Sequence, residues 1–332
     1  MALYPGLDVV RRRRYQGDGS SIKADERPVR MVPRLATRLQ AVRNLSWPVL
    51  LARTLRHAGV RSGWLDRLDF LNAPDATRPR KAVDILFGAM RSAGLDPQRI
   101  VERLPAATVL EIGCGRYIGF APLSAVAGAK LYIGADPGLK PELFQNRAVL
   151  DRIVDPAIAA SAALIERGPV DRADMLAKCR LERSGVAEAL RPDDAVDVCV
   201  SVSCLEHIGD LEASIRRVAA ASRPGTVHAH LVNFSNHLSK SAPFAHLYET
   251  DPSSFARDWG GIVNGFRHPD MAEMFRSAGL DLRFVPLDRV APDHMPAEIH
   301  SYWTERYEDD VLAVRTGLFF SEGLIRDQDV KS

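Results

Sequence analysis

The sequence feature that most constrains the fold is a short apolar run that ends in glycines. Thr108–Ile112 has the β-branched and aliphatic residues of a buried strand, and Gly113, Gly115 and Gly119 follow it closely. A strand that passes through a glycine turn into a helix presents bare backbone N–H groups to a ligand. Side chains at Gly113 or Gly115 would obstruct that approach. Because several nucleotide-binding folds share this spacing, it predicts a ligand loop and leaves the ligand open.

Strand-like and helix-like segments alternate along most of the chain. The expected strands are Thr108–Ile112, Lys130–Ala135, Ala195–Val202 and Val227–Val232, with a closing hairpin of Asp281–Pro286 and Val311–Phe320. The expected helices are Lys81–Gly94, Pro97–Leu104, Leu211–Ala221 and Met271–Ala278. Such alternation predicts parallel pairing. We therefore expect an α/β fold with a doubly wound, mostly parallel, seven-stranded Rossmann-like sheet in residues 76–332, of which six strands are placed, preceded by a basic helical extension in residues 1–75.

The extension differs in charge from the rest of the chain. Residues 1–80 contain sixteen Lys or Arg against seven Asp or Glu, a net charge of +9, so the remainder carries −7 of the total +2. Apolar residues at helical spacing between Pro33 and Leu71 predict an amphipathic helix, or two helices broken at Pro48. This pattern suits phosphates, an acidic partner, peripheral contact with an anionic membrane, or a solvated leader that is weakly ordered over residues 1–30.

The composition excludes a membrane-spanning or disulfide-stapled protein. No apolar run reaches the roughly 18–20 residues of a membrane helix, and no apolar segment follows Arg11–Arg14 as a secretory signal requires. The four cysteines form no CxxC pair and show no metal-ligand spacing. We therefore expect a cytoplasmic protein with free thiols and no metal site.

Two carboxylates flank the predicted glycine turn. Glu111 lies within the buried strand, where a carboxylate is costly unless a hydrogen-bond donor meets it. Asp136 ends the next strand, 25 residues after Glu111, and a carboxylate at that place accepts both ribose hydroxyls in dinucleotide-binding folds. A capping role before Pro137 would explain Asp136 alone. Together with Glu111 and the glycines, Asp136 favours a cofactor contact.

Four segments, taken in order, resemble class I S-adenosylmethionine-dependent methyltransferases. Val109–Gly115 is similar to the first motif of that family, and Gly185–Asp197 is similar to its adenine-side segment. Ser203–Ile208 with Asp210 resembles the Leu-Glu-His segment after the fourth strand, and Arg223–Gly225 resembles the turn before the fifth. The resemblance implies S-adenosyl-L-methionine as cofactor. It also implies a set of cofactor-binding residues: Glu111, Gly113, Cys114, Gly115, Asp136, Pro137, Ala187, Glu188, Ser203 and Leu205.

Two positions depart from the family pattern. Tyr117 stands where the family often has a glycine, and we expect it to narrow the cofactor mouth or to stack near the methionine. Val186 stands where the adenine-side segment usually has an aspartate. The adenine amino group would then be held by backbone or by another side chain, with modest affinity.

A nicotinamide-dependent oxidoreductase is the alternative within the same fold class. It also uses a glycine loop and an acidic residue after the second strand. That alternative leaves Glu111 unexplained, and none of the seven tyrosines begins a Tyr-x-x-x-Lys pair. The methyltransferase resemblance is therefore preferred.

The methyl acceptor is expected beyond the carboxyl ends of the fourth and fifth strands, where ligands of open α/β sheets bind. Methyl transfer needs alignment, and a base when the nucleophile is a hydroxyl. His237 is the first candidate for that base because histidine titrates near neutrality, although a loop histidine bonded to backbone is equally common. His207 is the second catalytic candidate and is expected chiefly to shape the cofactor pocket. The candidate acceptor-binding residues are Asn233, Asn236, Tyr248, Trp259 and Asn264.

The segment from Val232 to Leu280 is similar to methyltransferases of bacterial polysaccharide and glycan biosynthesis. Their Asp-His pair, Trp and Asn-Arg-Leu-Arg run correspond here to Asn236-His237, Trp259 and Asn264–Arg267. That resemblance implies a sugar or lipid-linked glycan hydroxyl as acceptor, within the broader class of small molecules. Two other functions stay open: methylation of a protein or nucleic acid, and non-catalytic cofactor binding. Nucleic acid is disfavoured because the extension has few aromatic residues for base stacking.

Overall fold

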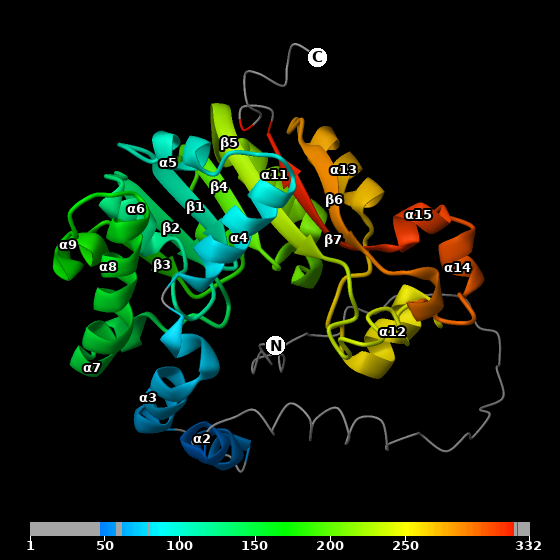
Figure 1. The fold of residues 1–332 in the computed structure, drawn as a ribbon, viewed down its shortest axis with the longest axis horizontal. Coiled ribbons are helices and arrows are strands. Elements are labelled where there is room, and N and C mark those ends of the chain that lie inside the picture. The colour runs from blue at the N-terminus through cyan, green and yellow to red at the C-terminus, as the bar shows by residue number, and fades with distance from the viewer. Residues whose placement is uncertain (1–46, 58–61, 79, 322–323, 325–332) are drawn as a thin grey trace.

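A single seven-stranded sheet forms the centre of the computed structural model, which describes residues 47–57, 62–78, 80–321 and 324 (Figure 1). The strand order is β3-β2-β1-β4-β5-β7-β6. The first five of these strands pair in parallel, and β7 is antiparallel to both β5 and β6. The predicted doubly wound, mostly parallel sheet is confirmed. The strands are β1 (Thr108–Ile112), β2 (Leu131–Ala135), β3 (Cys179–Glu182), β4 (Val196–Val202), β5 (Ser222–Asn233), β6 (Arg283–Arg289) and β7 (Val314–Phe320).

The sequence analysis placed most strands within a few residues and missed one. β1 has the predicted bounds, and β6 and β7 form the predicted closing antiparallel pair. The missed strand is β3, a four-residue edge strand whose residues are all half-buried, so its sequence lacks a buried apolar run. The turn expected at Arg223–Gly225 lies instead within the bounds of β5, which begins at Ser222. A register shift against β4 at Val196–Val198 marks this irregular start of β5.

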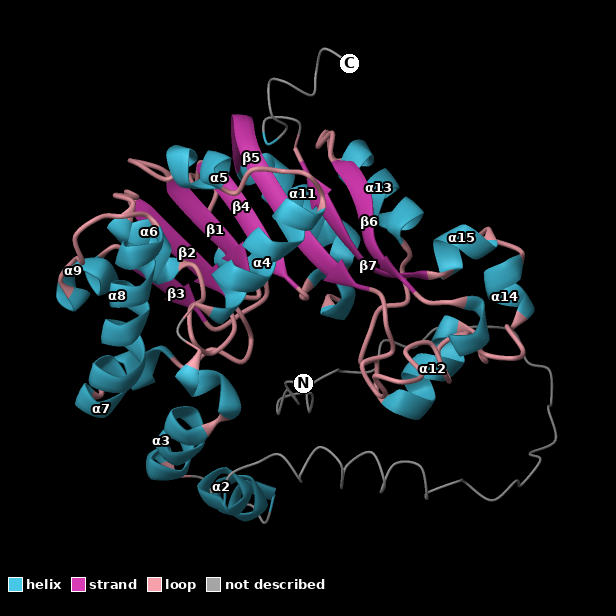
Figure 2. Cartoon of the chain, in the orientation of Figure 1, coloured by secondary structure: helices cyan, strands magenta, loops and turns pink. Residues whose placement is uncertain are grey.

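Helices cover both faces of the sheet (Figure 2). On one face, β4 and β5 contribute Val198, Val200 and Ala229 to a core with α4 (Lys81–Ser92), α5 (Gln98–Arg103), α6 (Ala121–Val126), α8 (Asp155–Leu164) and α9 (Arg172–Ala177). On the other face, a second core packs against α10 (Val186–Ala189), α11 (Leu211–Ala221) and α13 (His268–Ser277). Short turns complete this body: η1 (Pro74–Thr77), η2 (Pro141–Gln145), α7 (Arg147–Val149), η3 (Leu150–Val154) and η4 (Leu205–His207).

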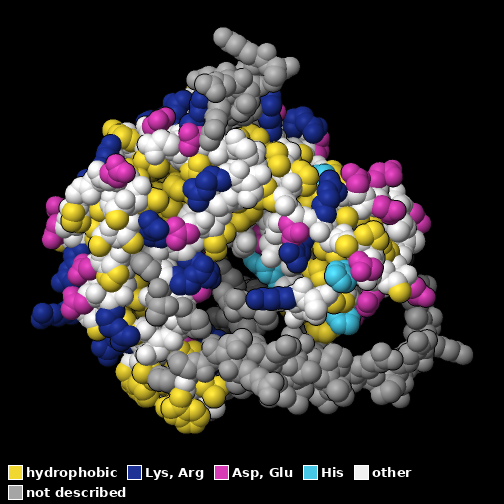
Figure 3. Space-filling model, in the orientation of Figure 1, with side chains coloured by type: hydrophobic (Ala, Val, Ile, Leu, Met, Phe, Trp, Pro, Cys, Tyr) yellow, Lys and Arg dark blue, Asp and Glu magenta, His cyan; other side chains and the backbone are white. Residues whose placement is uncertain are grey.

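A smaller lobe lies beyond the carboxyl ends of β4 and β5. It contains α12 (Pro252–Trp259), η5 (Pro292–His294), α14 (Ser301–Thr304) and α15 (Asp309–Leu312). Its own aromatic core includes Phe244, Tyr248, Phe255 and Trp303. Figure 3 shows a hollow between this lobe and the sheet, with histidine side chains on its wall. The lobe therefore supplies the second wall of the space into which the strands point.

Two N-terminal helices precede the body: the second contacts it beside the glycine loop, and the first packs against the second. These are α2 (Trp47–His57) and α3 (Gly63–Asn72), and Pro48 lies in the first turn of α2, where proline is tolerated, so it does not break that helix. Residues 33–46 of the predicted amphipathic stripe lie outside the described residues. Trp47, Leu51 and Trp64 are exposed, and they form part of the hydrophobic surface over α2 and α3 in Figure 3. Peripheral membrane contact through this extension stays a prediction.

Within the described parts of the chain, none of the helices combines the length and the apolar character that spanning a bilayer requires.

Candidate active site

The glycine loop after β1 is shaped by two residues in the left-handed region. Gly113 has φ 69° and Gly115 has φ 62°, a conformation that favours glycine. A Cβ at Gly113 would overlap the side chain of Cys204, whereas a Cβ at Gly115 would have no other part of the protein within 4 Å. The two positions therefore require glycine for different reasons. Gly113 lets the loop approach the end of β4, and Gly115 borders the open space that a ligand can enter.

The side chain of Glu111 lies inside the protein, beneath the glycine loop, and is hydrogen-bonded there. Its side chain is buried, and Oε2 accepts hydrogen bonds from the backbone N–H of Phe120 at 2.8 Å and from the Tyr132 hydroxyl. Burial raises the pKa of Glu111 to about 7. These contacts tie β1, the start of α6 and β2 together. Glu111 thus supports the loop, and the donors that a buried carboxylate requires are the Phe120 N–H and the Tyr132 hydroxyl.

Asp136 lies at the end of β2, against the same loop. Its carboxylate accepts hydrogen bonds from the N–H groups of Gly115 at 2.9 Å and Gly138 at 2.6 Å. Burial raises its pKa from 3.8. A carboxylate has about four acceptor positions, so two bonds leave capacity for the hydroxyls of a ligand. Asp136 is only 1% exposed, and its contact with a ribose stays a prediction.

The other expected cofactor residues differ in how far they are exposed. Cys114 and Leu205 are buried, Ala187 and Ser203 are half-buried, and Pro137 and Glu188 are exposed. Val186 is buried in the core beneath α10, so its side chain faces away from the solvent and not toward an adenine.

Tyr117 contacts the N-terminal extension. Its hydroxyl donates to the Phe70 carbonyl at 2.8 Å, and its ring lies 4.6 Å from the Phe70 ring. Next to it, Arg116 pairs with the buried carboxylate of Asp69 at 3.0 Å. The departure from the family glycine at this position therefore serves to dock α3 on the loop. The sequence analysis did not foresee this contact, because it joins residues 47 positions apart.

The two candidate catalytic histidines meet beside a buried carboxylate. The rings of His207 and His237 lie 4.7 Å apart in an edge-to-face arrangement. Oε1 of Glu206 lies 3.9 Å from Nε2 of His207 and 3.6 Å from Nε2 of His237. Burial raises the pKa of Glu206 to about 8 and lowers that of His237 to about 4. Glu206 was absent from the predicted site residues, although its place beside His207 was an available signal.

Most of the residues expected to bind the acceptor contact other groups of the protein instead. The Asn236 side chain is fully buried and bonds to four backbone groups of its own loop. The Asn264 amide donates to the carbonyls of Leu205 and Ile208, which holds the lobe against η4. Tyr248 is fully buried, so it offers no surface to an acceptor. The substrate contact expected of Asn236 and Tyr248 is thus replaced by packing within the lobe.

Asn233 and Trp259 keep partial exposure in this region. Asn233 ends β5, and its side-chain oxygen accepts the N–H of Ser235 at 3.1 Å. Trp259 is half-buried and stacks on His246 at 4.7 Å. Both side chains therefore remain candidates for contact with an acceptor.

A buried arginine organises the lobe core. Arg267 is 2% exposed and donates to the Phe234 carbonyl at 3.0 Å and to the Tyr248 hydroxyl at 2.9 Å. Its guanidinium also lies over the rings of Phe234, Tyr248 and Trp303. Aromatic faces attract a desolvated cation. Sequence reasoning named Arg267 only as part of a family run, because arginine is seldom buried.

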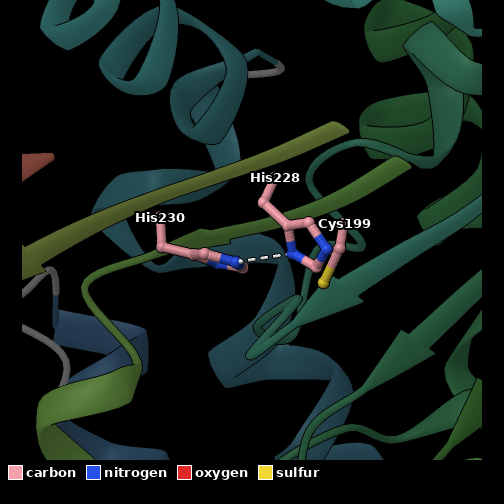
Figure 4. Close-up of side chains that lie close together, drawn as sticks. All are labelled: Cys199, His228 and His230. Carbon is pink, nitrogen blue, oxygen red and sulfur yellow. Dashed lines mark hydrogen bonds between the residues drawn. The ribbon is translucent and has the colours of Figure 1, made fainter. Parts of the chain in front are cut away.

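A second polar cluster lies inside the sheet, and its histidine nitrogens are all hydrogen-bonded within the protein. Figure 4 shows His228, His230 and Cys199, which come from β5 and β4. Ser222 donates to Val218 and so accepts from Nε2 of His228, whose Nδ1 then accepts from Nε2 of His230 at 3.3 Å. Nδ1 of His230 in turn accepts from Ser201 at 3.0 Å. Every ring nitrogen has a partner while both histidines are neutral.

This neutral chain predicts acid sensitivity. Burial lowers the pKa of His228 from 6.5 to about 4, and that of His230 is lowered further below 6.5. As pH falls below 6.5 the unfolded chain binds protons that the folded chain refuses, so the free energy of unfolding decreases. We expect a loss of about 1.4 kcal/mol per pH unit for each histidine between pH 6.5 and 5, measured by urea unfolding.

Variants separate these histidines from other titrating groups. His228→Asn removes one titrating ring and should make the dependence of unfolding free energy on pH shallower. His294→Gln, at an exposed position, is the matched control and should leave the slope unchanged. An unaltered slope in His228→Asn would contradict this account.

Comparisons with known proteins bear on the whole domain. A family model described as a methyltransferase domain matches residues 69–283. No curated protein matches the chain. An S-adenosylmethionine-dependent methyltransferase from Mesorhizobium loti is similar in structure, with 17% identity, a TM-score of 0.41, and coverage of 71% of this chain and 98% of that one. The YcgJ protein of Bacillus subtilis has 15% identity, a TM-score of 0.35 and coverage of 69% and 96%.

Because both TM-scores are below 0.5, neither structural likeness supports a conclusion about this chain. The family match covers well over half of the sequence, and it begins at α3 and ends in β6. The sheet order and the glycine loop between Glu111 and Asp136 agree with that match. The chain belongs to the methyltransferase domain family.

Proposed function

We propose that this protein transfers a methyl group from S-adenosylmethionine to a hydroxyl of a small molecule or glycan. The observation that carries the proposal is the meeting of Glu206, His207 and His237 at the carboxyl ends of β4 and β5. Cys204, which precedes Glu206 by two residues, has the side chain that a Cβ at Gly113 would overlap. The three side chains therefore lie next to the cofactor loop, where an acceptor must be deprotonated.

The cofactor site fits its expected ligand in two respects. Gly115 borders open space that a Cβ would enter, and the carboxylate of Asp136 keeps acceptor capacity at the edge of the loop. When bound, S-adenosylmethionine supplies a methyl group on a positively charged sulfur, which an acceptor oxygen displaces while the S–C bonding pair stays on sulfur. In this proposal Gly113 and Gly115 keep the loop close to the ligand, and Asp136 holds the ribose.

His237 is the proposed base. Nε2 of His237 lies 3.3 Å from the Asn233 carbonyl, which can only accept, so Nε2 carries the proton and Nδ1 carries the lone pair. Its lowered pKa keeps the ring neutral at pH 7, so that its lone pair is available, but also makes it a weaker base than an ordinary histidine. Oε1 of Glu206, 3.6 Å away, stabilises the protonated ring when Glu206 is ionised. His207 packs against His237 and positions it.

Calorimetric titration of S-adenosylmethionine tests the cofactor site. We expect micromolar binding to the wild type and binding weaker by about 1–3 kcal/mol in Asp136→Asn, since hydrogen bonds to a charged acceptor are lost. Asp171→Asn is the matched control, because Asp171 also accepts two backbone N–H groups but at the exposed start of α9. Equal affinities in wild type and Asp136→Asn would refute the assignment of Asp136.

The acceptor is tested by release of S-adenosylhomocysteine. Sugars, nucleotide sugars, oligosaccharides and simple alcohols would be offered beside protein and nucleic acid substrates. Turnover of a hydroxyl compound supports the proposal. Turnover confined to protein or nucleic acid, or S-adenosylmethionine binding without any turnover, would overturn it.

A further inference from the structure

We propose that Glu206, His207 and His237 also form a binding site for a divalent metal ion of the Zn²⁺ type. The inference deepens the proposed function, since it places the ion inside the proposed acceptor site, but ion binding can be measured without any acceptor. It goes beyond the expectation from sequence, which foresaw no metal. Histidine nitrogen and carboxylate oxygen are ligands that Zn²⁺ prefers.

The first support is the spacing of the ligand atoms. One ligand atom from each of Glu206, His207 and His237 lies within 4.8 Å of the other two. Ligands bound tetrahedrally at about 2.0–2.1 Å are separated from one another by roughly 3.3 Å. The distances of 3.6 and 3.9 Å from Oε1 of Glu206 to the two Nε2 atoms are slightly longer. Small side-chain rotations would bring all three ligands onto one ion, and Nε2 of His237 would also have to pass its proton to Nδ1 and give up its 3.3 Å contact with the Asn233 carbonyl.

The second support is a carboxylate oxygen that lacks a partner. Glu206 is 2% exposed, and within the described part of the chain its Oε2 has no hydrogen-bond donor. The carboxyl group is otherwise met by its own backbone N–H and by a long bond of 3.3 Å from the N–H of Asn233 to Oε1. A buried carboxylate with so few donors is costly, and a bound cation removes that cost. This observation is independent of the spacing and points to a missing positive charge.

The third support is the orientation of His207. Its Nδ1 lies 2.6 Å from the Ile262 carbonyl, which can only accept, so Nδ1 carries the proton. In the neutral ring the lone pair is then on Nε2, the nitrogen that faces Glu206. Histidines that bind metals usually donate their second nitrogen to a carbonyl or carboxylate in this way. The lobe, which supplies Ile262, thus sets the tautomer that an ion needs.

The cluster of Cys199, His228 and His230 lacks these signs. Its ring nitrogens are all hydrogen-bonded to one another or to serines. Burial also raises the pKa of the Cys199 thiol, which opposes the thiolate form that binds metals. Two clusters with metal-ligand spacing are found among the described residues. Of these, only the one at Glu206 contains a buried oxygen without a hydrogen-bond partner.

A bound ion would change the role of His237. Three protein ligands leave a position of a tetrahedral ion open, as in catalytic zinc sites, and the ion can lower the pKa of a hydroxyl beside it. The proton of the acceptor then passes to water, and His237 serves as a ligand. Base catalysis by His237 therefore belongs to the metal-free protein, and the two roles exclude one another.

Titration of ZnCl₂ into tag-free, metal-stripped protein tests the site. We expect one ion per chain with a Kd in the micromolar range or tighter. Glu206→Gln and His207→Asn should each weaken binding at least 10-fold, whereas His294→Gln and Cys199→Ser should not. Melting temperatures show whether the variants are folded. Absence of binding, or binding that is lost in Cys199→Ser and kept in Glu206→Gln, would overturn the proposal.

Cobalt substitution of the wild type tests the ligands without any variant. Co²⁺ bound by Glu206 and the two histidines should give visible d–d absorption without the near-ultraviolet charge-transfer band of a thiolate ligand. A thiolate band would contradict the site. Titration of S-adenosylmethionine into the stripped protein keeps the two proposals apart, because cofactor binding and hydroxyl methylation can persist when no ion binds.

Discussion

Gly113→Ala is expected to unfold the cofactor loop and abolish S-adenosylmethionine binding, whereas Gly115→Ala should abolish binding but leave the protein folded. Both changes place alanine in the left-handed region, at a cost of about 1–2 kcal/mol. At Gly113 the new Cβ also overlaps Cys204, which adds roughly 1–3 kcal/mol of overpacking. At Gly115 the Cβ enters the open space beside the loop, where the ligand is expected. Thermal unfolding and calorimetric titration measure the two effects.

Gly94→Ala is the matched control for backbone strain. Gly94 has φ 76°, follows α4, and has open space around a built Cβ. Its variant should lose about as much stability as Gly115→Ala and keep full cofactor affinity. Adding Cys204→Gly to Gly113→Ala should restore part of the lost stability, because the overlapping side chain is gone. Normal cofactor binding by Gly115→Ala would show that the open space is not the cofactor site.

His237→Gln is expected to lower the rate of methyl transfer about 100- to 10,000-fold while cofactor affinity changes little. A positioned general base contributes rate factors of this size. The rate would be followed as release of S-adenosylhomocysteine with the best hydroxyl acceptor, and cofactor affinity by calorimetry. The zinc titration of the same variant then shows whether the lost group was a base, a metal ligand, or each in a different state of the protein.

His246→Gln is the matched control for His237→Gln. Both histidines lie in the lobe with positive φ, 65° for His246 and 56° for His237, so both variants bear similar backbone strain. His246 lies 3.2 Å from Glu249 in a partly exposed position and stacks on Trp259, and none of its contacts among the described residues is with Glu206. Its variant should retain most of the activity. Similar rates in both variants would rule out a specific role for His237.

The sequence determined the features that depend on neighbouring residues. The apolar run of β1, the glycines after it and the alternation of strands with helices each follow from local periodicity or backbone freedom, so the fold class was predictable. Asp136 was placed at the end of β2 in the same way, because the apolar strand stops there. Such features need no knowledge of which segments meet in space.

Only the tertiary structure decided what the side chains of distant segments do. Glu111 meets Tyr132 because β1 and β2 pair side by side, and Gly113 is constrained by Cys204 from the end of β4. Asn236 and Tyr248 turned out to be buried, since the lobe folds around its own aromatic core.

The catalytic cluster is the clearest case of this division. Glu206 and His237 are 31 positions apart and come together because β4 and β5 end at the same edge of the sheet. The partnerless oxygen of Glu206 and the carbonyl that orients His207 depend on how the lobe closes over that edge. Local pattern predicts which residues reach this edge, whereas strand pairing and the packing of the lobe decide which of their atoms face one another.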